Sequence, residues 1–209
     1  TALQTAIRLG RPLAAVFVFD RDIIDDLPAD DRRLSFIHES ISEMQAALRV
    51  KNVPLWVLHG RAAEVVPALA TQLNAAAVVC AEDYEPQAIA RDNQVWRALD
   101  ADGRALVRVT DQVMLAKAEV MTQQGRPYSV FTPYKRAWLQ KLDAFQRTPY
   151  PVQRYAQHLA ALPSPSTPLP TLEALGFTPT NLPTLALPTG MSGAQQLLQD
   201  FLPRLHAYH

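Results

Sequence analysis

Short apolar runs alternate with helix-like stripes from the start of the chain to residue 109. The runs are nearly continuous, which indicates strands buried on both faces, as in a parallel sheet; they occupy residues 13–19, 53–58, 75–81 and 105–109. The stripes predict helices over residues 1–9, 62–73 and 86–99, and one that begins near Asp31 and runs to Leu48. This alternation predicts an α/β fold, a Rossmann-like parallel sheet with flanking helices.

The apolar positions of the helices predict which side packs inward. The helix near Asp31 has one apolar face with spacings of three and four, formed by Leu34, Ile37, Ile41, Met44 and Leu48. In helix 86–99 the inward positions are Ile89, Trp96 and Leu99. Pro67 predicts that helix 62–73 bends or starts late, because proline cannot donate the helical hydrogen bond.

Proline changes the pattern after residue 147. Nine of the seventeen prolines fall within residues 148–189, and Glu173 is the only formally charged side chain in residues 155–199. A tract such as 162–172 cannot form a helix or a central strand, since proline lacks a backbone donor and restrains the residue before it. A disordered linker is normally richer in charge. We therefore interpret residues 148–190 as an ordered, extended connector along a surface.

Two further stripes predict helices outside the sheet. One precedes the connector and consists of Phe131, Tyr134, Trp138, Leu142 and Phe145. The other predicts a closing helix over residues 192–208, whose broad apolar face needs a partner: Ala194, Leu197, Leu198, Phe201, Leu205 and Tyr208. The predicted organisation is an α/β domain (1–147), a connector (148–190) and the start of a helical domain (191–209).

Composition excludes several classes of protein. Lys and Arg number 20 and so do Asp and Glu, so no basic field exists to hold nucleic acid nonspecifically. The single cysteine, Cys80, excludes an internal disulfide and a cysteine-rich zinc site, and in its apolar strand it is interpreted as a buried hydrophobe. No apolar run approaches the roughly 20 residues needed to span a bilayer, and no secretory leader is visible. We expect a cytoplasmic protein.

The sequence holds no familiar phosphate-binding, metal-binding or nucleophilic motif. The seven glycines are scattered, without a Walker loop or a G-x-G-x-x-G pattern. The histidines lack metalloenzyme spacing, and the pair His206 and His209 has no accompanying carboxylate. We therefore expect no metal site and nominate no catalytic residue within the chain.

Polar residues at two predicted strand ends are more informative. Residues 19–22 (Phe-Asp-Arg-Asp) close the first strand, and residues 82–86 (Glu-Asp-Tyr-Glu-Pro) close the third. Ligands of open α/β sheets bind outside the carboxyl ends of the strands. The same carboxylates are also suited to cap the helices that follow. Both interpretations remain open at this point.

These motifs and one further segment carry a resemblance to a known family. Segment 125–134 reads Gly-Arg-Pro-Tyr-Ser-Val-Phe-Thr-Pro-Tyr and is the most specific, and Trp138 follows it. In order and spacing it agrees with segments 17–23, 31–37, 83–86 and 90–92. Together they resemble the photolyase/cryptochrome family over essentially the whole chain.

The resemblance implies a deoxyribodipyrimidine photolyase, which uses light and reduced FAD to split cyclobutane pyrimidine dimers in DNA. The FAD, the lesion pocket and the electron-transfer tryptophans would belong to a helical half outside this sequence. Trp56, Trp96 and Trp138 are then packing residues, and only Tyr208 matches a position at the edge of the FAD site. The chain alone is expected neither to repair DNA nor to retain FAD. Its partners would be the helical domain and, through that domain, DNA, in a monomeric protein.

The α/β half of this family holds a light-harvesting antenna in some members. A planar chromophore needs an apolar wall, hydrogen-bonding groups for its ring edge and a cation for any acidic tail. By resemblance, the positions that hold a deazaflavin antenna are Phe17, Asp20, Arg33 and Glu85. The folate branch carries an Asn-Glu pair where this chain has Gln87 and Ala88. This departure favours a deazaflavin or another flavin over methenyltetrahydrofolate.

Two alternative functions and one expectation about the sheet remain. A cryptochrome photoreceptor shares this half of the family and is not separated from a photolyase by these residues. A free-standing nucleotide-binding module is disfavoured by the lack of a glycine-rich phosphate loop.

The helix at residues 1–9 implies a preceding strand, which in the resembled family is central to the sheet. We therefore expect a strand-wide gap in the sheet or strands that have re-paired.

Overall fold

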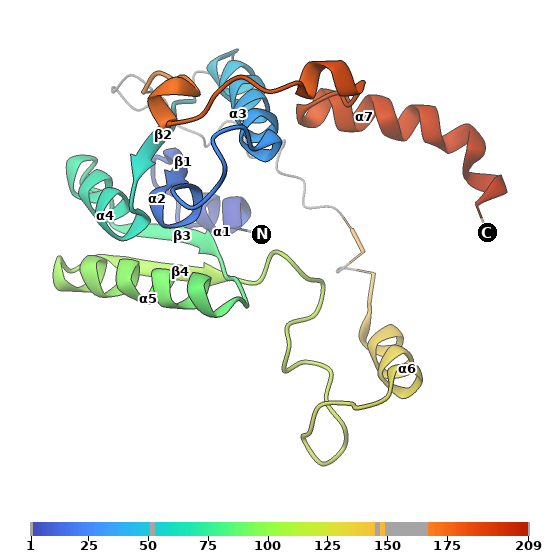
Figure 1. The fold of residues 1–209 in the computed structure, drawn as a ribbon. Helices are drawn as coiled ribbons and strands as arrows, with labels where there is room; N and C mark the ends of the chain where they lie inside the picture. The colour runs from blue at the N-terminus through green and yellow to red at the C-terminus, as the bar shows by residue number, and fades with distance from the viewer. Residues whose placement is uncertain (1, 51–52, 145–146, 149–166, 209) are drawn as a thin grey trace. The chain divides into compact units, whose positions relative to one another are not determined.

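The structure is a computed structural model that describes residues 2–50, 53–144, 147–148 and 167–208 (Figure 1). The chain divides into two compact units, and each is described by itself. Unit 1 comprises residues 1–11 and 66–158, and unit 2 comprises residues 12–65 and 159–209. The described strands form two separate parallel pairs, one in each unit, with helices before and after them. This mixed arrangement confirms the predicted α/β class.

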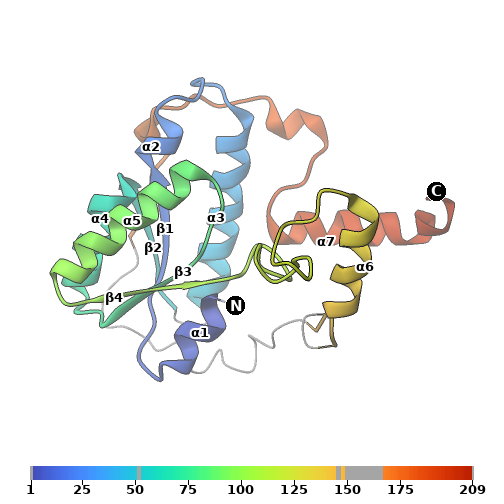
Figure 2. The ribbon, with the colours of Figure 1, turned by 90° about the horizontal axis from the view of Figure 1, so that it is seen from below.

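Unit 2 begins with two strands and two helices: β1 (Ala15–Asp20), α2 (Arg21–Ile24), α3 (Arg32–Val50) and β2 (Leu55–Gly60). The strands pair in parallel, with Ala15 opposite Leu55 and Asp20 opposite Gly60. Both strands therefore end at the same edge of the pair. Figure 2 shows α3 running beside the two strands. β2 starts after Pro54, while the N–H of Val53 closes the end of α3 on the carbonyl of Leu48 at 3.0 Å.

The core of unit 2 combines the β1–β2 pair, α3 and residues from the carboxyl-terminal part of the chain. Its buried members are Phe19, Ile24, Leu34, Ile41, Leu55, Val57, Leu175 and Phe177. Leu169 and Leu172 pack against this cluster from the same late segment. The described end of the proline-rich segment is thus an integral part of the core.

The inward face of α3 differs from the predicted one. Leu34 and Ile41 are buried as predicted, but Ile37 and Met44 are 36% and 48% exposed. Ser35 is buried in their place, and its Oγ accepts a hydrogen bond of 3.0 Å from the hydroxyl of Thr180. The late segment packs on the Ser35 side and turns the buried face of the helix toward it.

Side chains replace a neighbouring strand along the free edge of β2. The hydroxyl of Thr167 accepts from the Val57 N–H at 2.6 Å and donates to the Val57 carbonyl at 2.9 Å. Nε2 of Gln45 donates to the Thr167 carbonyl at 2.9 Å and to the Leu55 carbonyl at 3.4 Å. Alternate residues of a strand direct their backbone groups to the same edge. Both backbone groups of Val57 and the carbonyl of Leu55 on that edge are therefore satisfied without a third strand.

The late segment continues along α3 and leads into α7 (Gly190–Phe201). The Thr178 N–H donates to the Ala29 carbonyl at 2.8 Å, and Arg32 donates to Asn181 at 2.7 Å. The start of α7 is held by Glu43, whose carboxylate accepts from the Ser192 N–H at 2.9 Å and from the Ser192 hydroxyl at 2.8 Å. Glu43 on α3 thus acts as the N-terminal cap of α7.

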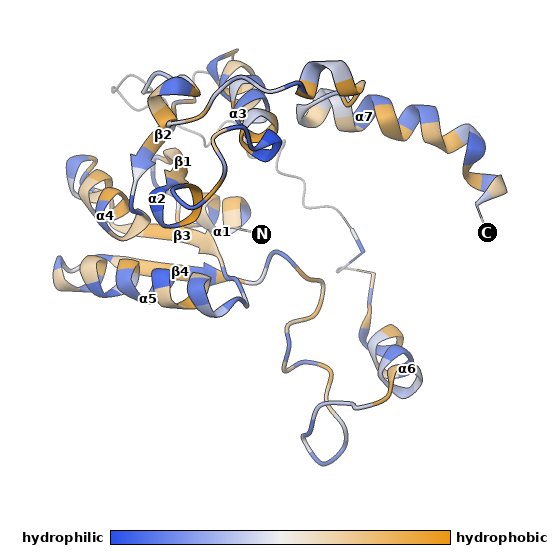
Figure 3. Cartoon of the chain, in the orientation of Figure 1, coloured by the Kyte–Doolittle hydropathy of each residue, from blue (hydrophilic) through white to orange (hydrophobic). Residues whose placement is uncertain are grey.

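The predicted closing helix is shorter than expected. α7 ends at Phe201, and a 3-10 segment, Leu202–Ala207, follows because Pro203 cannot continue the α-helical hydrogen bonding. Gly193 is the buried residue of α7, and Leu198 and Leu205 are 56% and 50% exposed. Figure 3 shows apolar positions along α7 and the segment after it. Leu197, Phe201 and Tyr208 are exposed as well.

Unit 1 contains the second strand pair and its helices: α1 (Ala2–Arg8), the latter part of α4 (Ala62–Gln72), β3 (Ala77–Ala81), α5 (Pro86–Ala101), β4 (Ala105–Val109) and α6 (Phe131–Lys141). β3 and β4 pair in parallel, and α1 contacts both. Helix α4 begins at Ala62 and contains Pro67, so of the two predicted alternatives, a bend or a late start, the late start is wrong. The Ala62 N–H donates to Asp20 at 3.3 Å, which fixes the start of the helix.

The predicted inward face of α5 is partly wrong. Ile89 and Trp96 are 37% and 45% exposed, and Trp96 is therefore not a buried packing residue. The buried stripe is Ala88, Asp92, Val95 and Leu99. Asp92 is tolerated there because its carboxylate pairs with Arg91 at 2.9 Å. A charged residue inside the stripe hides the true packing face from a hydrophobicity pattern.

Helix α6 has no buried residue among those described, and Phe131 is 72% exposed. Leu142 follows the helix instead of extending its stripe, and the predicted position Phe145 lies outside the described residues. Lys141 at the end of the helix donates to the Glu119 carbonyl. Within the described residues, no helix is long and apolar enough to cross a membrane.

Candidate functional site

Asp20 closes β1 and is the most informative of the predicted site residues. It is 4% exposed and is the N-cap of α2. Its Oδ1 accepts from the Asp22 N–H at 3.2 Å and from the Ala62 N–H at 3.3 Å. Its Oδ2 is buried and has no hydrogen-bond partner in the described part of the chain. One oxygen therefore caps two helix starts, and the other is left to accept a further hydrogen bond.

The strand ends around Asp20 carry charged side chains. An open pocket of about 400 Å³ at the end of β2 is lined by Arg21, His59, Gly60, Arg61, Glu64 and Val65. The arginines are already paired: Arg61 contacts Asp22 at 3.1 Å, and Arg21 contacts Asp25 at 2.9 Å. The hydrogen bond from Arg21 to Asp25 raises the pKa of the arginine. The carboxyl edge of the β1–β2 pair is thus a polar surface in which positive charge is locally compensated.

Gly60 allows α4 to start close to the end of β2. Its φ is +155°, and a Cβ at this position would lie 2.5 Å from Cγ1 of Val65. A side chain here would push the first turn of α4 away from the strand. The close approach keeps the Ala62 N–H within reach of Asp20.

Phe17 lies three residues before Asp20 on β1 and supplies an apolar ring. Its ring meets that of Phe19 edge-on, with centroids 5.0 Å apart and an interplanar angle of 76°. Phe17 is half-buried and packs against the core cluster, whereas Phe19 is fully enclosed in it. The exposed part of Phe17 is suited to an apolar wall held rigidly from behind by Phe19.

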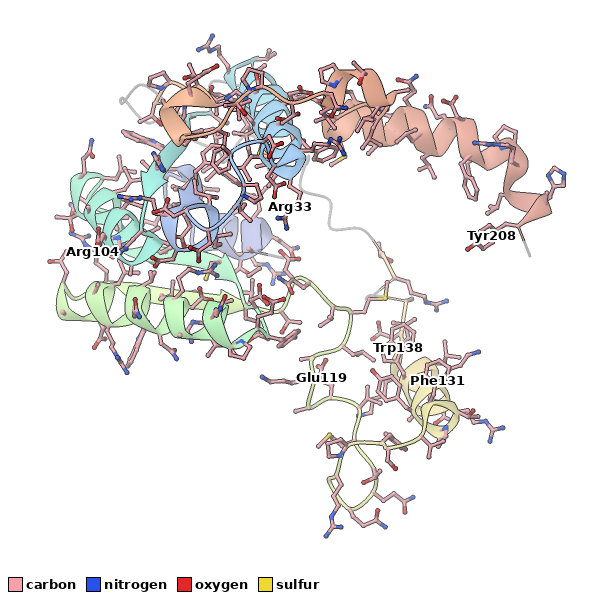
Figure 4. The ribbon with its side chains drawn as sticks, in the orientation of Figure 1. Arg33, Arg104, Glu119, Phe131, Trp138 and Tyr208 are labelled. Atoms are coloured by element: carbon pink, nitrogen blue, oxygen red, sulfur yellow. The ribbon has the colours of Figure 1, made fainter. Side chains whose placement is uncertain are left out.

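Arg33 lies at the start of α3, where Figure 4 shows its side chain at the surface. Asp31 holds it: Nε of Arg33 lies 3.0 Å from Oδ1, and Nη2 lies 2.6 Å from Oδ2. Asp31 also accepts the Arg33 backbone N–H at 2.9 Å, which caps the helix. The Arg33 side chain lowers the pKa of Asp31, and Asp31 raises the pKa of Arg33. Sequence reasoning identified Arg33 and the helix-starting role of Asp31 but not this pairing.

Glu85 belongs to unit 1, at the N-cap of α5. Its side chain is exposed and makes no capping hydrogen bond. The turn before it is organised by Asp83, whose Oδ1 accepts from the Tyr84 N–H at 2.6 Å and the Glu85 N–H at 3.2 Å. The Glu85 and Tyr84 N–H groups lower the pKa of Asp83. At this strand end Asp83 has the structural role, and the Glu85 carboxylate is left available.

Three other residues stand out in the sequence: Tyr208, Trp56 and Cys80. Tyr208 is 76% exposed at the end of the chain, and its ring meets that of Phe201 edge-on with centroids 6.1 Å apart. Trp56 is 5% exposed within β2, as predicted for a packing residue, but its Nε1 has no partner in the described residues. Cys80 is only half-buried, contrary to the buried position predicted, and burial raises the pKa of its thiol. The described residues hold no cluster suited to a metal ion.

Comparison with known proteins points to one family. The profile of the DNA photolyase family matches residues 1–154. A deoxyribodipyrimidine photo-lyase of Halobacterium salinarum is 35% identical over 192 residues, covering 91% of this chain and 38% of that protein. The chain therefore spans well under half of the length of this relative.

Solved structures agree with this similarity. The crystal structure of a bacterial class III photolyase from Agrobacterium tumefaciens superposes with a TM-score of 0.74 at 23% identity, covering 96% of this chain and 41% of that one. An archaeal photolyase from Sulfolobus tokodaii, described with two FAD molecules, has a TM-score of 0.53 at 24% identity over 65% of this chain and 30% of its own. At these identities the likeness establishes the fold.

Proposed function

The chain belongs to the DNA photolyase family, and we propose that it is the antenna-binding α/β part of a deoxyribodipyrimidine photolyase. In the complete protein, light and FAD would drive the repair of cyclobutane pyrimidine dimers in DNA. Two findings support this: the family profile matches residues 1–154, and a photo-lyase is 35% identical over 91% of the chain. The proposed organisation keeps the α/β domain (1–147), the connector (148–190) and the start of the helical domain (191–209).

Membership of the family implies a flavin cofactor for the complete protein. Tyr208, the one residue matched to the edge of the FAD site, is 76% exposed, and its ring meets that of Phe201. The chain also lacks a net positive charge. We therefore place FAD and DNA on the helical domain, outside this sequence.

The observation that carries the antenna site is the buried Oδ2 of Asp20, which has no hydrogen-bond partner among the residues that the structure describes. A buried acceptor without a donor costs about 1–3 kcal/mol, so a ligand that donates an N–H or O–H there recovers that energy. Flavins and deazaflavins carry such a donor at the edge of a planar ring. Within unit 2, Phe17 would supply the apolar wall and Arg33 a cation. Glu85, in unit 1, is proposed as a further polar group on the family resemblance alone. When bound, the chromophore would absorb light and pass its excitation energy to the FAD.

We propose a flavin-type chromophore for this site. The archaeal relative is described with two FAD molecules and a proposed light-harvesting cofactor. Gln87 and Ala88 replace the Asn-Glu pair of the folate branch, and Ala88 is buried in the packing stripe of α5. A deazaflavin or flavin is therefore favoured over methenyltetrahydrofolate.

Asp20→Asn tests the antenna site directly. The amide oxygen keeps the acceptor for Asp22 and Ala62, while the amide NH2 replaces the free acceptor with a donor. We expect riboflavin, followed by its fluorescence as it is titrated into the 209-residue chain, to bind at least 1 kcal/mol more weakly to this variant. Asp22→Asn is the matched control, since Asp22 is exposed and pairs with Arg61. Equal affinity in wild type and Asp20→Asn would exclude Asp20 as a ligand.

The repair activity is tested on the complete protein. Light-dependent loss of thymine dimers from DNA is expected from the complete protein and not from the 209-residue chain. A complete protein that binds FAD and leaves dimers intact would instead belong with the cryptochrome photoreceptors.

A further inference from the structure

Asp31 controls how Arg33 is presented at the start of α3. The Nε and Nη2 edge of the guanidinium is taken up by the carboxylate at 3.0 and 2.6 Å, which leaves the end formed by Nη1. The side chain of Asp31 is 11% exposed, whereas that of Arg33 is 70% exposed. The carboxylate is therefore fixed in the structure, and the arginine is oriented by it.

The charge around Arg33 is also balanced. Arg32 and Arg33 follow directly on Asp30 and Asp31 in the sequence. Arg32 donates to the neutral side chain of Asn181 at 2.7 Å, in an open pocket that Asp30 and Asp31 also line. Two arginines and two aspartates sum to zero formal charge. A ligand phosphate entering here meets one carboxylate for each guanidinium.

We propose that Asp31 is the residue that sets the preference of the antenna site for an uncharged over a phosphorylated chromophore tail. This inference rests on the proposed antenna function. Asp31 occupies the Nε and Nη2 edge of the Arg33 guanidinium and offsets its charge. Nη1 is left to donate hydrogen bonds to the hydroxyl groups of an uncharged tail. A phosphate dianion gains little from a guanidinium that is already paired, and it is repelled by the carboxylate beside it.

Riboflavin and FMN form a matched pair of probes, since they differ only by the phosphate. We expect wild type to bind riboflavin at least as tightly as FMN. In Asp31→Asn, the affinity for FMN relative to riboflavin should rise on the order of three- to tenfold at low salt. Asparagine caps a helix as well as aspartate does, so the change removes the charge and keeps the start of α3.

Three further variants separate specificity from structure. Asp30→Asn removes the same negative charge but leaves Asp31 paired with Arg33. Its effect on the ratio of FMN affinity to riboflavin affinity should therefore be smaller. In an Arg33→Gln background, Asp31→Asn should leave the ratio unchanged, because the group that it releases is gone. Asp31→Ser retains a capping hydroxyl and serves as a second charge-removing variant if the asparagine variant is poorly folded by circular dichroism.

The outcomes distinguish this inference from the proposed function. An unchanged ratio in both Asp31 variants, or a lower relative affinity for FMN, would overturn it while riboflavin binding that depends on Asp20 still supports the antenna site. A shift that persists in the Arg33→Gln background would also overturn it. If wild type binds neither probe, the proposed flavin-type antenna fails and the inference fails with it.

Discussion

Replacing Thr167 with valine tests the most unusual contact of the connector. Valine keeps the shape of the side chain and removes the hydroxyl that serves both backbone groups of Val57, at 2.6 and 2.9 Å. Val57 is 4% exposed, so water does not readily take over. Each unsatisfied buried group costs about 1–3 kcal/mol. Allowing for partial solvation at a strand edge, we expect a total loss of about 2–4 kcal/mol, a large part of the roughly 5–15 kcal/mol that stabilises a domain.

The assay is urea unfolding followed by circular dichroism, together with hydrogen exchange at the Val57 amide. Exchange at this amide should accelerate in Thr167→Val more than at amides of α3. Thr167→Ser is the control, because it retains the hydroxyl and should remain within about 1 kcal/mol of wild type. If Thr167→Val unfolds like wild type and the Val57 amide stays protected, Thr167 does not complete the edge of β2.

Three further predictions concern the same unit. Phe177→Ala should cost about 3–5 kcal/mol in urea unfolding because it opens a cavity in the core, whereas the exposed Leu185→Ala should have little effect. Gly190→Ala should destabilise more than Gly176→Ala: both have positive φ, but only at Gly190 would a Cβ lie 2.0 Å from the Glu43 carboxylate, and the difference should disappear in a Glu43→Ala background. The Ser192 hydroxyl and N–H lower the pKa of Glu43, so its stabilisation is complete above the unfolded value of about 4.3 and is lost as the pH falls through the lower folded value. Unfolding midpoints measured from about pH 6 to 3 should therefore show a steeper acid loss in wild type than in Glu43→Gln.

The sequence predicted the elements of the fold where the local pattern is strong. The apolar runs located each strand of the described residues, because buried parallel strands have apolar residues on both faces. The observed start of β2 differs from the predicted one because proline lacks a backbone N–H: the strand begins only after Pro54. The end of α7 moved for the same reason, since Pro203 follows directly on its last turn.

Packing faces were predicted less well because they depend on distant parts of the chain. The buried side of α3 includes Ser35, which becomes a core position only when Thr180 bonds to it. The buried side of α5 includes Asp92, whose charge is offset by Arg91. No pattern within either helix contains this information. For this reason the sequence pattern places Trp96 in the interior, whereas the structure leaves it 45% exposed.

The candidate site shows the same division. The sequence predicts that the carboxylate of Asp20 either caps a helix or binds a ligand. In the structure Oδ1 is a cap, and Oδ2 has no partner within the described residues. The pairing of Asp31 with Arg33 spans two positions in sequence. The preference for aspartate at helix starts predicts the capping role of Asp31, but it does not predict that the same carboxylate also binds the Arg33 guanidinium.

The core of unit 2 also has a consequence for how the chain folds during synthesis. Val57 and Thr167 are 110 residues apart, and most of unit 1 is made between them. At about 5–20 residues per second, the ribosome needs roughly 5–20 s to supply the segment that closes the edge of β2. Until then, β2 presents an unpaired edge and the core lacks Leu175 and Phe177. During synthesis, unit 2 therefore passes through a period in which a strand edge and apolar core surface are open to aggregation, and slower translation of unit 1 lengthens it.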